Sequence, residues 1–572
     1  MKKTATIAAL VLTGTMVAHA QGQPAPYARR WFYAPHNLLD EKQVERVLAL
    51  IQRARRAGYN GMVLADDKLG ILDQVPEAYF AHVQRVRRAA EEAQIEIIPA
   101  VFPIGYSGRL LAHNPNLAEG LPVVDVPFIV RGREAFLVPQ PSAKIVNGNL
   151  EDAQENRFSA FMLQDDPGKT TFADHTVVHG GNTSVRIQDA ARGDTNRNYR
   201  LAQRVQVRPH ACYRFSAWVK TRDLNPVSGF QLFARSARLA HRPLSFFEAH
   251  LGPTQDWTQV DVVFNTLEEN EIELYIGHWG AQSGTMWIDD LVLEELPLVN
   301  VLRREGCPLD IRSEDGKTTY EEGRDYEPIR DPHLGQHPFP GEYEFSHPGP
   351  QIRLTLHSRI SEGQKLRVSW YHPIIIHGFQ VTSCLIERAV FDVLREQARR
   401  VNDLFKPRTF FMLHDEIRVA NWCRACQMRN VSAGKLLAEN VAQCIRILKQ
   451  INPAANIVVW SDMFDPNHNA IDRYDLVRGS LSGSWKGLTS EVIIANWNLD
   501  HATESLKWFA ALGHSQIVAG YYDSSLANYR KWEVASRGVQ RISGFMYTTW
   551  EGKYDLLEEY GRAMLGAIPR TP

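Results

Sequence analysis

The fold is decided by three short apolar runs near the N-terminus: WFYAPH at 31–36, GMVLAD at 61–66 and IEIIPAV at 95–101. Apolar residues recur at helical spacing after Asp40, and again over about 78–93. Asp40 is suited to cap the first of these helices and Gly58 to end it. This order of strand, helix, strand, helix and strand predicts parallel strands with helices outside them.

The same alternation returns in the C-terminal third of the chain. Further predicted strands cover 409–416, 456–462, 492–497, 516–522 and 544–550, with helices over about 385–404 and 432–450. Three predicted strands lie in the N-terminal region and five in the C-terminal third, which makes eight. The two regions together contain roughly 300 residues, which is in the size range of a (β/α)₈ barrel. We therefore predict an α/β fold, a TIM barrel whose parts are 30–140 and 367–568.

Two features leave alternatives to this barrel. Leu366–Trp370 is a ninth candidate strand, which could instead close a neighbouring β module. A doubly wound open sheet is the rival fold, but no glycine-rich phosphate loop follows the first strand.

The middle of the chain has a different pattern. From about 142 to 297 short alternating segments such as Tyr213–Val219 are separated by turn residues, with almost no helical periodicity. This pattern predicts an all-β sandwich inserted into the barrel. Residues 298–366 stay β-like but are richer in proline, glycine and charge, and we predict a small second β-rich module or linker there.

Residues 1–20 have the layout of a secretory signal peptide: Lys2 and Lys3, an apolar run over 7–17, and Ala20 at the expected cleavage site. We expect a periplasmic or secreted protein. No later stretch approaches the roughly 20 apolar residues that a membrane helix needs, so no membrane span is predicted.

The overall charge narrows the class of partner. Lys+Arg of 64 against Asp+Glu of 65 gives a net charge of -1, so no global field favours nucleic acid. Thirteen Trp and nineteen Tyr suit a neutral oligosaccharide or polysaccharide, because aromatic faces stack on sugar rings.

The six cysteines are too few for a disulfide-dependent scaffold. Cys423 and Cys426 form a C-x-x-C without a second pair or a nearby histidine, so a zinc site would lack half its ligands. A local disulfide or two free thiols are the favoured interpretations, and we expect no metal in the barrel.

The active site of such a barrel lies at the C-terminal ends of its strands. The residues that end the predicted strands are unusually polar and aromatic, and we predict that they bind substrate or act on it: His36, Asp66, Asp67, Tyr106, His414, Asp415, Glu416, Trp460, Asp462, Trp497, Tyr522, Asp523, Trp550 and Glu551. Each has a structural alternative, since the aspartates could cap helices and the tryptophans could lie in the core.

The adjacent acids Asp415 and Glu416 are the sharpest signal. Neighbouring side chains at a strand end diverge, so one can point into the barrel mouth while the other supports it. A carboxyl group partly desolvated by nearby tryptophans would have a raised pKa and could act as general acid toward a glycosidic oxygen. The alternative is an ion pair with Arg418 or a helix cap.

The segment from Phe411 to Asp462 resembles the family 20 glycoside hydrolases, the β-N-acetylhexosaminidase type. The resemblance rests on the acidic pair Asp415-Glu416, the helix starting at Ser432 and Val459–Met463, and the later strand ends follow in the family's order. It implies that Asp415 orients the substrate acetamido group, that Glu416 is the general acid/base, and that no cofactor is needed. It also implies that Trp460, Trp497 and Trp550 wall the sugar site and that Tyr522 contacts the acetamido group.

Four ordered motifs in the insertion, at 146–151, 179–187, 213–220 and 286–291, resemble carbohydrate-binding sandwich modules associated with cellulases and xylanases. Modules of this type often hold a structural calcium, for which Asn149, Glu151 and Asp289 are the candidate ligands. Because the module interrupts the barrel, we expect it to shape the active-site mouth.

The leading hypothesis is an exported glycoside hydrolase. One alternative is a retaining glycosidase in which Glu551 is the nucleophile beside Glu416. Another is a non-catalytic glycan-binding surface protein. A third is a barrel enzyme of another reaction type, such as a lyase or a metal-dependent deacetylase, for which His36, Asp66 and His414 are the candidate metal ligands.

Overall fold

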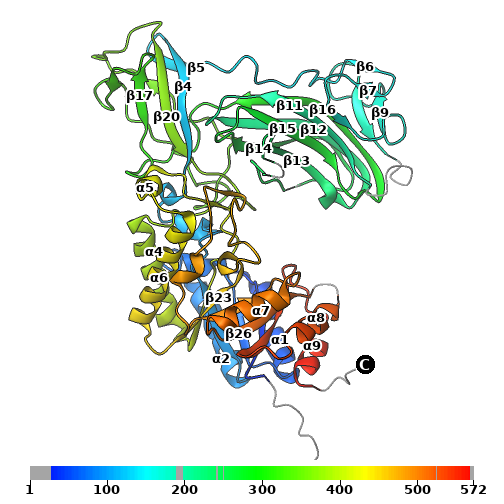
Figure 1. Cartoon of the computed structure of the whole chain (residues 1–572), viewed down its shortest axis with the longest axis vertical. Helices are drawn as coiled ribbons and strands as arrows, with labels where there is room; N and C mark the ends of the chain where they lie inside the picture. Colours follow the sequence, from blue (N-terminus) through cyan, green and yellow to red (C-terminus); the bar gives the residue numbers. More distant parts are fainter. Residues whose placement is uncertain (1–26, 189–196, 240–241, 249, 523–524, 567–572) are drawn as a thin grey trace, which may run out of the picture.

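The computed structural model describes residues 27–188, 197–239, 242–248, 250–522 and 525–566. The predicted signal peptide lies outside these ranges. The described chain forms a barrel, a six-stranded sheet above it and a sandwich beside that sheet, as Figure 1 shows. No helix within the described ranges is both long enough and apolar enough to cross a membrane.

The barrel is closed and its eight strands are parallel, as predicted. In order around the barrel they are β1 (Arg29–Ala34), β2 (Gly61–Leu64), β3 (Glu96–Val101), β21 (Thr409–Met412), β23 (Asn456–Trp460), β25 (Ile493–Asn496), β26 (Gln516–Tyr521) and β27 (Ile542–Thr548). The barrel helices are α1 (Glu41–Arg56), α2 (Glu77–Glu92), α4 (Arg388–Phe405), α6 (Ala433–Ile451), α7 (Ala502–Ala511), α8 (Ala527–Ala535) and α9 (Leu557–Met564). The predicted fold class is therefore confirmed.

Alternation along the strands separates two cores. Phe411 on β21 packs inside the barrel with Val458 of β23, whereas Phe410 and Met412 face the helices. At the start of α1 the Asp40 side chain accepts a hydrogen bond from the Lys42 backbone N–H, which caps the helix as the sequence predicts. Strand register is thus set by the inward residues, and it fixes where each strand end points.

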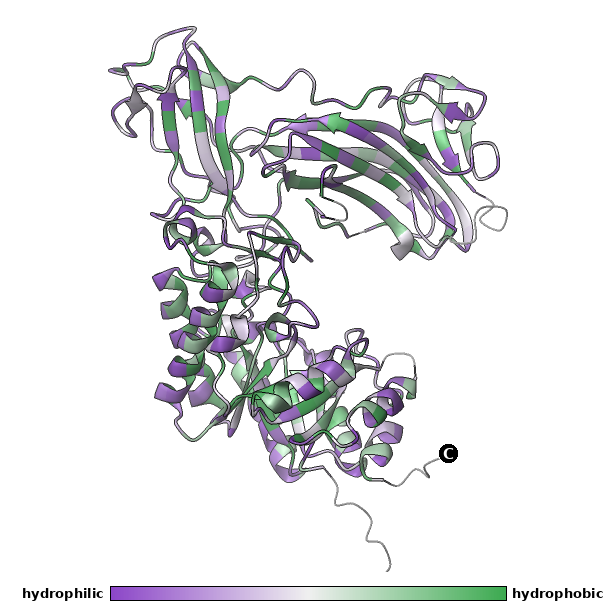
Figure 2. Cartoon of the chain, in the orientation of Figure 1, coloured by the Kyte–Doolittle hydropathy of each residue, from purple (hydrophilic) through white to green (hydrophobic). Residues whose placement is uncertain are grey.

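The insertion contains the predicted sandwich. One sheet has the order β14-β12-β16-β10-β9 and the other β13-β15-β11-β8. The strands are β8 (Leu163–Gln164), β9 (Thr171–Asp174), β10 (Ser184–Ile187), β11 (Tyr199–Gln206), β12 (Cys212–Asn225), β13 (Phe230–Ser236), β14 (Gln255–Asn265), β15 (Glu271–His278) and β16 (Ser283–Glu295). Hydrophobic and hydrophilic residues alternate along these strands in Figure 2, as expected where one sheet face is buried.

A separate six-stranded sheet links the sandwich to the barrel and corrects the predicted boundaries. Its strands are β18 (Thr319–Tyr320), β17 (Asp310–Ser313), β20 (Lys365–His372), β4 (Leu121–Arg131), β5 (Glu134–Leu137) and β19 (Ile352–Arg353). β4 buries one face and pairs antiparallel with β20, which contains the ninth candidate strand. The barrel part predicted over 30–140 therefore ends before Leu121, and the part predicted from 367 begins after His372.

The sandwich is consequently an insertion within an insertion. Strands of the six-stranded sheet flank it on both sides in the sequence, and their buried residues share one hydrophobic core with those of the sandwich. Two hydrogen bonds join them: the Val124 backbone N–H donates to the His210 carbonyl at 2.9 Å, and the Asn265 side-chain amide donates to the Pro122 carbonyl at 3.0 Å.

Candidate active site

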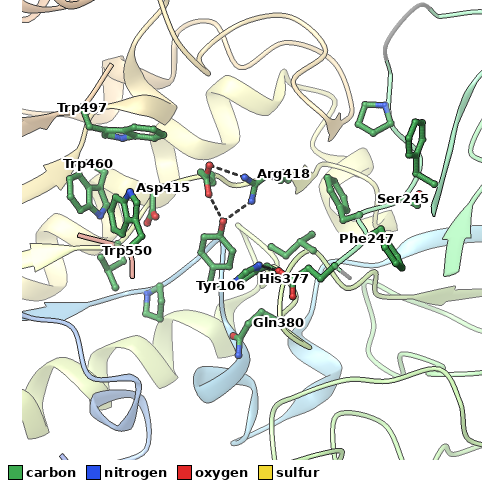
Figure 3. A pocket seen from close by; sticks show the side chains of 18 of the residues that line it. Tyr106, Ser245, Phe247, His377, Gln380, Asp415, Arg418, Trp460, Trp497 and Trp550 are labelled. Carbon is green, nitrogen blue, oxygen red and sulfur yellow. Dashed lines mark hydrogen bonds and ion pairs between the residues drawn. The ribbon is translucent and has the colours of Figure 1, made fainter. Parts of the chain in front are cut away.

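A cavity of about 950 Å³ lies at the C-terminal ends of the barrel strands. Barrel, sandwich and the segment after β20 all contribute to its wall, as Figure 3 shows. Of the predicted residues, Tyr106, Asp415, Glu416, Trp460, Trp497 and Trp550 line it. The strand-end rule therefore brings together residues from β3, β21, β23, β25 and β27.

Aromatic rings wall the inner part of the cavity. The ring of Tyr33, at the end of β1, lies 5.8 Å from that of Trp460 and 5.4 Å from that of Trp550. Trp460 and Trp550 are 5.8 Å apart. Trp460 is buried, whereas 49% of Trp550 is exposed. These flat faces, with Asp415 beside them in Figure 3, can enclose a single sugar ring.

Asp415 lies in surroundings that favour its neutral form. Burial and the nearby carboxylates of Asp462 and Glu416 raise its pKa to about 8. The nearby loop after β3 depends on Gly105, where an added Cβ would lie 2.3 Å from the Asp415 carbonyl oxygen. This close approach holds Asp415 at the floor of the cavity, where it can carry a proton at neutral pH.

Glu416 has different partners from its neighbour. Its carboxylate pairs with Arg418, with 2.7 Å between Oε1 and Nη2, and it accepts a hydrogen bond from the Tyr106 hydroxyl. Arg418 also donates to that hydroxyl at 2.6 Å, and the three groups form the triangle drawn in Figure 3. The predicted alternative of an ion pair with Arg418 is therefore present within the site itself. Arg418 was not among the predicted site residues.

Glu416 adopts a left-handed backbone conformation with φ 45°. This conformation is uncommon for a non-glycine residue and has to be held by its surroundings. The Asp462 carboxylate accepts the Glu416 backbone N–H at 2.8 Å. The same carboxylate accepts the Asn469 amide at 3.0 Å and the Trp497 indole N–H at 3.4 Å. Asp462 is fully buried and thus positions Glu416 and Trp497 from outside the cavity.

The sandwich closes the outer side of the cavity. Phe233 on β13 and Phe247 in the following loop line it, together with His377 from the segment after β20. Glu248 pairs with the His377 ring and accepts the Gly378 backbone N–H at 3.0 Å, which fastens the sandwich loop to that segment. The sandwich therefore lines this cavity, as expected if the cavity is the active site.

No model of a protein family matches this sequence, and neither does the sequence of any curated protein. Similar solved structures include a family 20 β-N-acetylglucosaminidase, at 10% identity and TM-score 0.36 over 96% of this chain and 70% of that one. A rhamnosidase from Novosphingobium sp. PP1Y matches at 11% identity and TM-score 0.33 over 94% of this chain and 58% of that one.

The carbohydrate-binding module TmCBM61, solved with β-1,4-galactotriose, matches at 17% identity and TM-score 0.21. That match covers 27% of this chain and 97% of the module. Both resemblances predicted above are thus found among solved structures.

Two predicted residues at the end of β2 lie outside the cavity lining. Asp66 caps the short 3₁₀ helix η1 (Asp67–Gly70) by accepting the Lys68 N–H at 3.0 Å, and it also accepts the Tyr79 hydroxyl at 2.9 Å. Asp67 pairs with Lys68 and Arg109, each at 2.7 Å. The capping alternative therefore describes Asp66, and ion pairing describes Asp67.

Three further predicted residues are buried away from the cavity lining. His36 stacks on Tyr554 with 5.9 Å between ring centroids, and His414 faces the Asn440 amide at 3.1 Å. Tyr522 belongs to a cluster of buried tyrosines between strands and helices. Among the described residues, His36, Asp66 and His414 do not form a ligand cluster, which removes the support for a metal-dependent deacetylase.

The residues after the last strands are placed differently. Glu551 does not line the cavity; it is exposed and pairs with Lys553. Asp523 lies outside the described residues.

The sequence reasoning missed several residues of the site. Tyr33 is not among the predicted residues because it lies three residues before the end of the predicted strand. Its inward position nevertheless follows from the alternation of side chains along β1. Phe247 and His377 lie in loops of the insertion, and no local pattern relates them to the barrel mouth.

The candidate calcium ligands already contact main-chain groups. Glu151 accepts the N–H groups of Asn182 and Thr183 at 2.7 and 3.0 Å. Asp289 accepts the His179 N–H at 2.8 Å. Asn149, two residues before Glu151 in the sequence, is exposed. A calcium ion at this loop stays a prediction.

Proposed function

We propose that this chain is a glycoside hydrolase whose reaction centre is the pair Asp415-Glu416. The observation that carries the proposal is this acidic pair at the floor of a cavity with aromatic walls. A cavity of this shape suits a neutral sugar, which needs stacking surfaces and a few polar groups. The substrate is an oligosaccharide or polysaccharide, and the leader predicted over 1–20 would place the reaction in the periplasm or outside the cell.

The cavity offers two kinds of wall, and these suggest two subsites. Tyr33, Trp460 and Trp550 enclose the inner part, where the sugar that contributes the anomeric carbon would bind. Phe247 and His377 lie on the outer side, where the leaving part of the glycan would extend. The insertion thereby supplies the leaving-group subsite of a barrel enzyme.

The contacts suggest how the two acids divide the work. Asp415, with its raised pKa, holds the proton that passes to the glycosidic oxygen as the bond to the anomeric carbon breaks. The Glu416 carboxylate, paired with Arg418, stabilises the positive charge that develops on the sugar ring. A water molecule then adds its hydroxide to the anomeric carbon and returns a proton to Asp415.

The family resemblance implies the opposite division. Glu416 would then be the general acid/base, and Asp415 would accept a hydrogen bond from a 2-acetamido group that attacks the anomeric carbon. One observation favours this second candidate: Asp415 lies beside Trp460 and Trp550, where an acetamido group of a bound sugar would be enclosed. This division requires Asp415 to be ionised during the reaction.

The test is hydrolysis of a panel of aryl glycosides, with and without a 2-acetamido group, by the wild type and by single variants. We expect Asp415→Asn and Glu416→Gln each to lose about 10²–10⁴-fold in kcat. Glu551→Gln is the matched control, and it should keep full activity because Glu551 does not line the cavity.

Each other outcome has a definite meaning. Loss of activity in Glu551→Gln would support the retaining pair of Glu416 and Glu551 instead. Turnover restricted to 2-acetamido sugars would support substrate assistance. Glycan binding without turnover of any sugar by the wild type would contradict an enzyme and leave a glycan-binding protein.

A further inference from the structure

Four cysteines that are far apart in the sequence meet between the barrel and its insertion. Cys307 precedes β17, Cys384 precedes α4, and Cys423 and Cys426 belong to the C-x-x-C at the start of α5 (Arg424–Met428). All four side chains are fully buried, and none forms a disulfide. Cys307 and Cys384 thus supply the second half that the C-x-x-C lacks in the sequence.

Two of the sulfur–sulfur distances match those of a tetrahedral metal site. The Sγ atom of Cys384 lies 3.7 Å from that of Cys423 and 3.7 Å from that of Cys426. A zinc–sulfur bond of about 2.3 Å places the corners of a tetrahedron about 3.8 Å apart. The Cys307 thiol interacts with that of Cys423 and supplies a fourth sulfur next to these three, although it lies outside the group of ligand atoms that are all within 4.8 Å of one another.

A carboxylate and a guanidinium surround these sulfurs. Glu119 is buried, with one oxygen 3.9 Å from the Cys426 sulfur. Its other oxygen accepts the backbone N–H groups of Trp422 and Cys423 at 2.7 and 2.9 Å. The ligand atoms of Glu119, Cys384, Cys423 and Cys426 all lie within 4.8 Å of one another. Outer groups that orient ligands in this way are typical of metal sites.

Arg304 provides positive charge next to this group. Its guanidinium donates to the carbonyls of Asn116 and Ala118 at 2.9 and 3.2 Å and pairs with Glu387 at 3.0 Å. Thiolates bound to one divalent ion carry excess negative charge, and a buried excess charge needs a partner. Arg304 lies three residues before Cys307 and is suited to that role.

We propose that Cys384, Cys423, Cys426 and Cys307 bind one structural Zn²⁺ ion, with Glu119 orienting the C-x-x-C from outside the ligand set. Four cysteine sulfurs are a donor set of structural zinc sites, which are tetrahedral. A disulfide is the competing chemistry. It would join only two of the four sulfurs, at about 2.05 Å, and would leave two buried thiols and a carboxylate unused.

The position of the site indicates what the ion would do. Glu119 and Cys307 lie where the chain leaves and re-approaches the barrel, and Cys384 lies where the barrel resumes. Cys423 follows Glu416 by seven residues, through a loop that carries Arg418. The ion would therefore tie the loop of the acidic pair to the base of the insertion.

The first test is elemental analysis of the purified full-length chain, combined with counting of thiols after unfolding without reductant. We expect about one zinc per chain and six reactive thiols once zinc is chelated. Four reactive thiols without zinc would indicate a disulfide and overturn the proposal. One equivalent of iron in place of zinc would also overturn it.

Variants and a cobalt probe test the ligand set. Cys423→Ser and Cys307→Ser should each lose zinc, while Cys444→Ser, at a buried cysteine elsewhere in the barrel, should keep it. Where a variant does not fold, the wild type refolded with Co²⁺ keeps the question open to measurement, since tetrahedral thiolate ligation gives intense charge-transfer bands. Retention of zinc in Cys307→Ser together with its loss in Glu119→Gln would overturn the assignment of the fourth ligand.

Discussion

Asp415 and Glu416 are neighbours in the chain but meet different surroundings. Asp415 is enclosed by aromatic side chains and faces other carboxylates, which raises its pKa to about 8. Glu416 turns toward Arg418 and Tyr106 because its own backbone is held in the left-handed region by Asp462. These two adjacent acids therefore place a carboxyl group with a raised pKa next to an ion-paired carboxylate at the same strand end, as the proposed acid-assisted cleavage requires.

The first prediction concerns the pH dependence of activity. If Asp415 donates the proton, kcat/KM falls as the pH rises through about 8, because the ionised acid has no proton to give. The apparent value belongs to Asp415 and Asp462 together, since their carboxylates influence each other. Initial rates on an aryl glycoside between pH 5 and 9.5, with unfolding checked at each pH, provide the measurement. A rate that instead rises through pH 8 would support Asp415 as the ionised orienter.

The second prediction concerns stability. The pKa of Asp415 is higher in the folded chain than its ordinary value of 3.8, so the folded state holds this proton more tightly than the unfolded state. Its contribution to the free energy of unfolding is full below about pH 4 and is lost as the pH rises toward 8. Asp415→Asn cannot ionise, so its thermal stability should exceed that of the wild type increasingly from pH 5 to pH 8.

Asp67→Asn is the control with the opposite sign. Although burial opposes it, hydrogen bonds from Lys68 and Arg109 lower the pKa of Asp67. The charged form therefore stabilises the fold above the ordinary pKa, and the variant should be less stable than the wild type at pH 6 to 8. Melting temperatures that shift in the same direction for both variants would contradict the assignment of charge.

At the scale of elements, local sequence patterns explain which parts of the fold could be predicted and which could not. Period-two and period-3.6 patterns over β1, β2, β3, β21 and α1 predict the barrel, because these elements bury one side against their neighbours. β4 also alternates, and the sequence alone does not show that it pairs with β20, more than 200 residues later. For the same reason, local patterns could not predict the positions of Phe247 and Cys307, because these depend on contacts between distant segments.

The third prediction concerns the loop after β13. Phe247 lines the outer part of the cavity and packs on Phe230 with 5.6 Å between ring centroids. Phe247→Ala removes a stacking surface from the leaving-group side, so KM for an oligosaccharide should rise about tenfold. Turnover of a simple aryl glycoside, which does not reach this wall, should stay unchanged.

Phe136→Ala provides the matched control, since Phe136 is an exposed aromatic residue of β5 that does not line the cavity. Steady-state kinetics on both substrates should show no change for this variant. An equal rise in KM for the oligosaccharide in both variants would mean that the sandwich loop is not a subsite.

At the scale of the whole molecule, the three parts form a continuous structure. The sandwich and the six-stranded sheet share one core, and Val419, Trp422 and Leu476 from loops of the barrel belong to it. The Trp422 indole donates to the Leu476 carbonyl at 2.5 Å. Trp422 lies six residues after Glu416 in the chain. The insertion thus reaches the loop of the acidic pair both through this core and through the cysteine cluster.

The fourth prediction follows from this shared core. The Gln140 backbone N–H donates to the Glu295 side chain at 2.8 Å, so the two ends of the sandwich are close enough to be joined by a short Gly-Ser linker. Deletion of the sandwich between Gln140 and Glu295 should nevertheless expose the apolar face of β4 and β20 and the packing surface of Trp422. We expect a chain that is less soluble, melts at a lower temperature and has lost activity even on a simple aryl glycoside. A deletion variant with the melting temperature and aryl glycoside turnover of the wild type would show instead that the barrel is an independent enzyme and the sandwich an accessory to it.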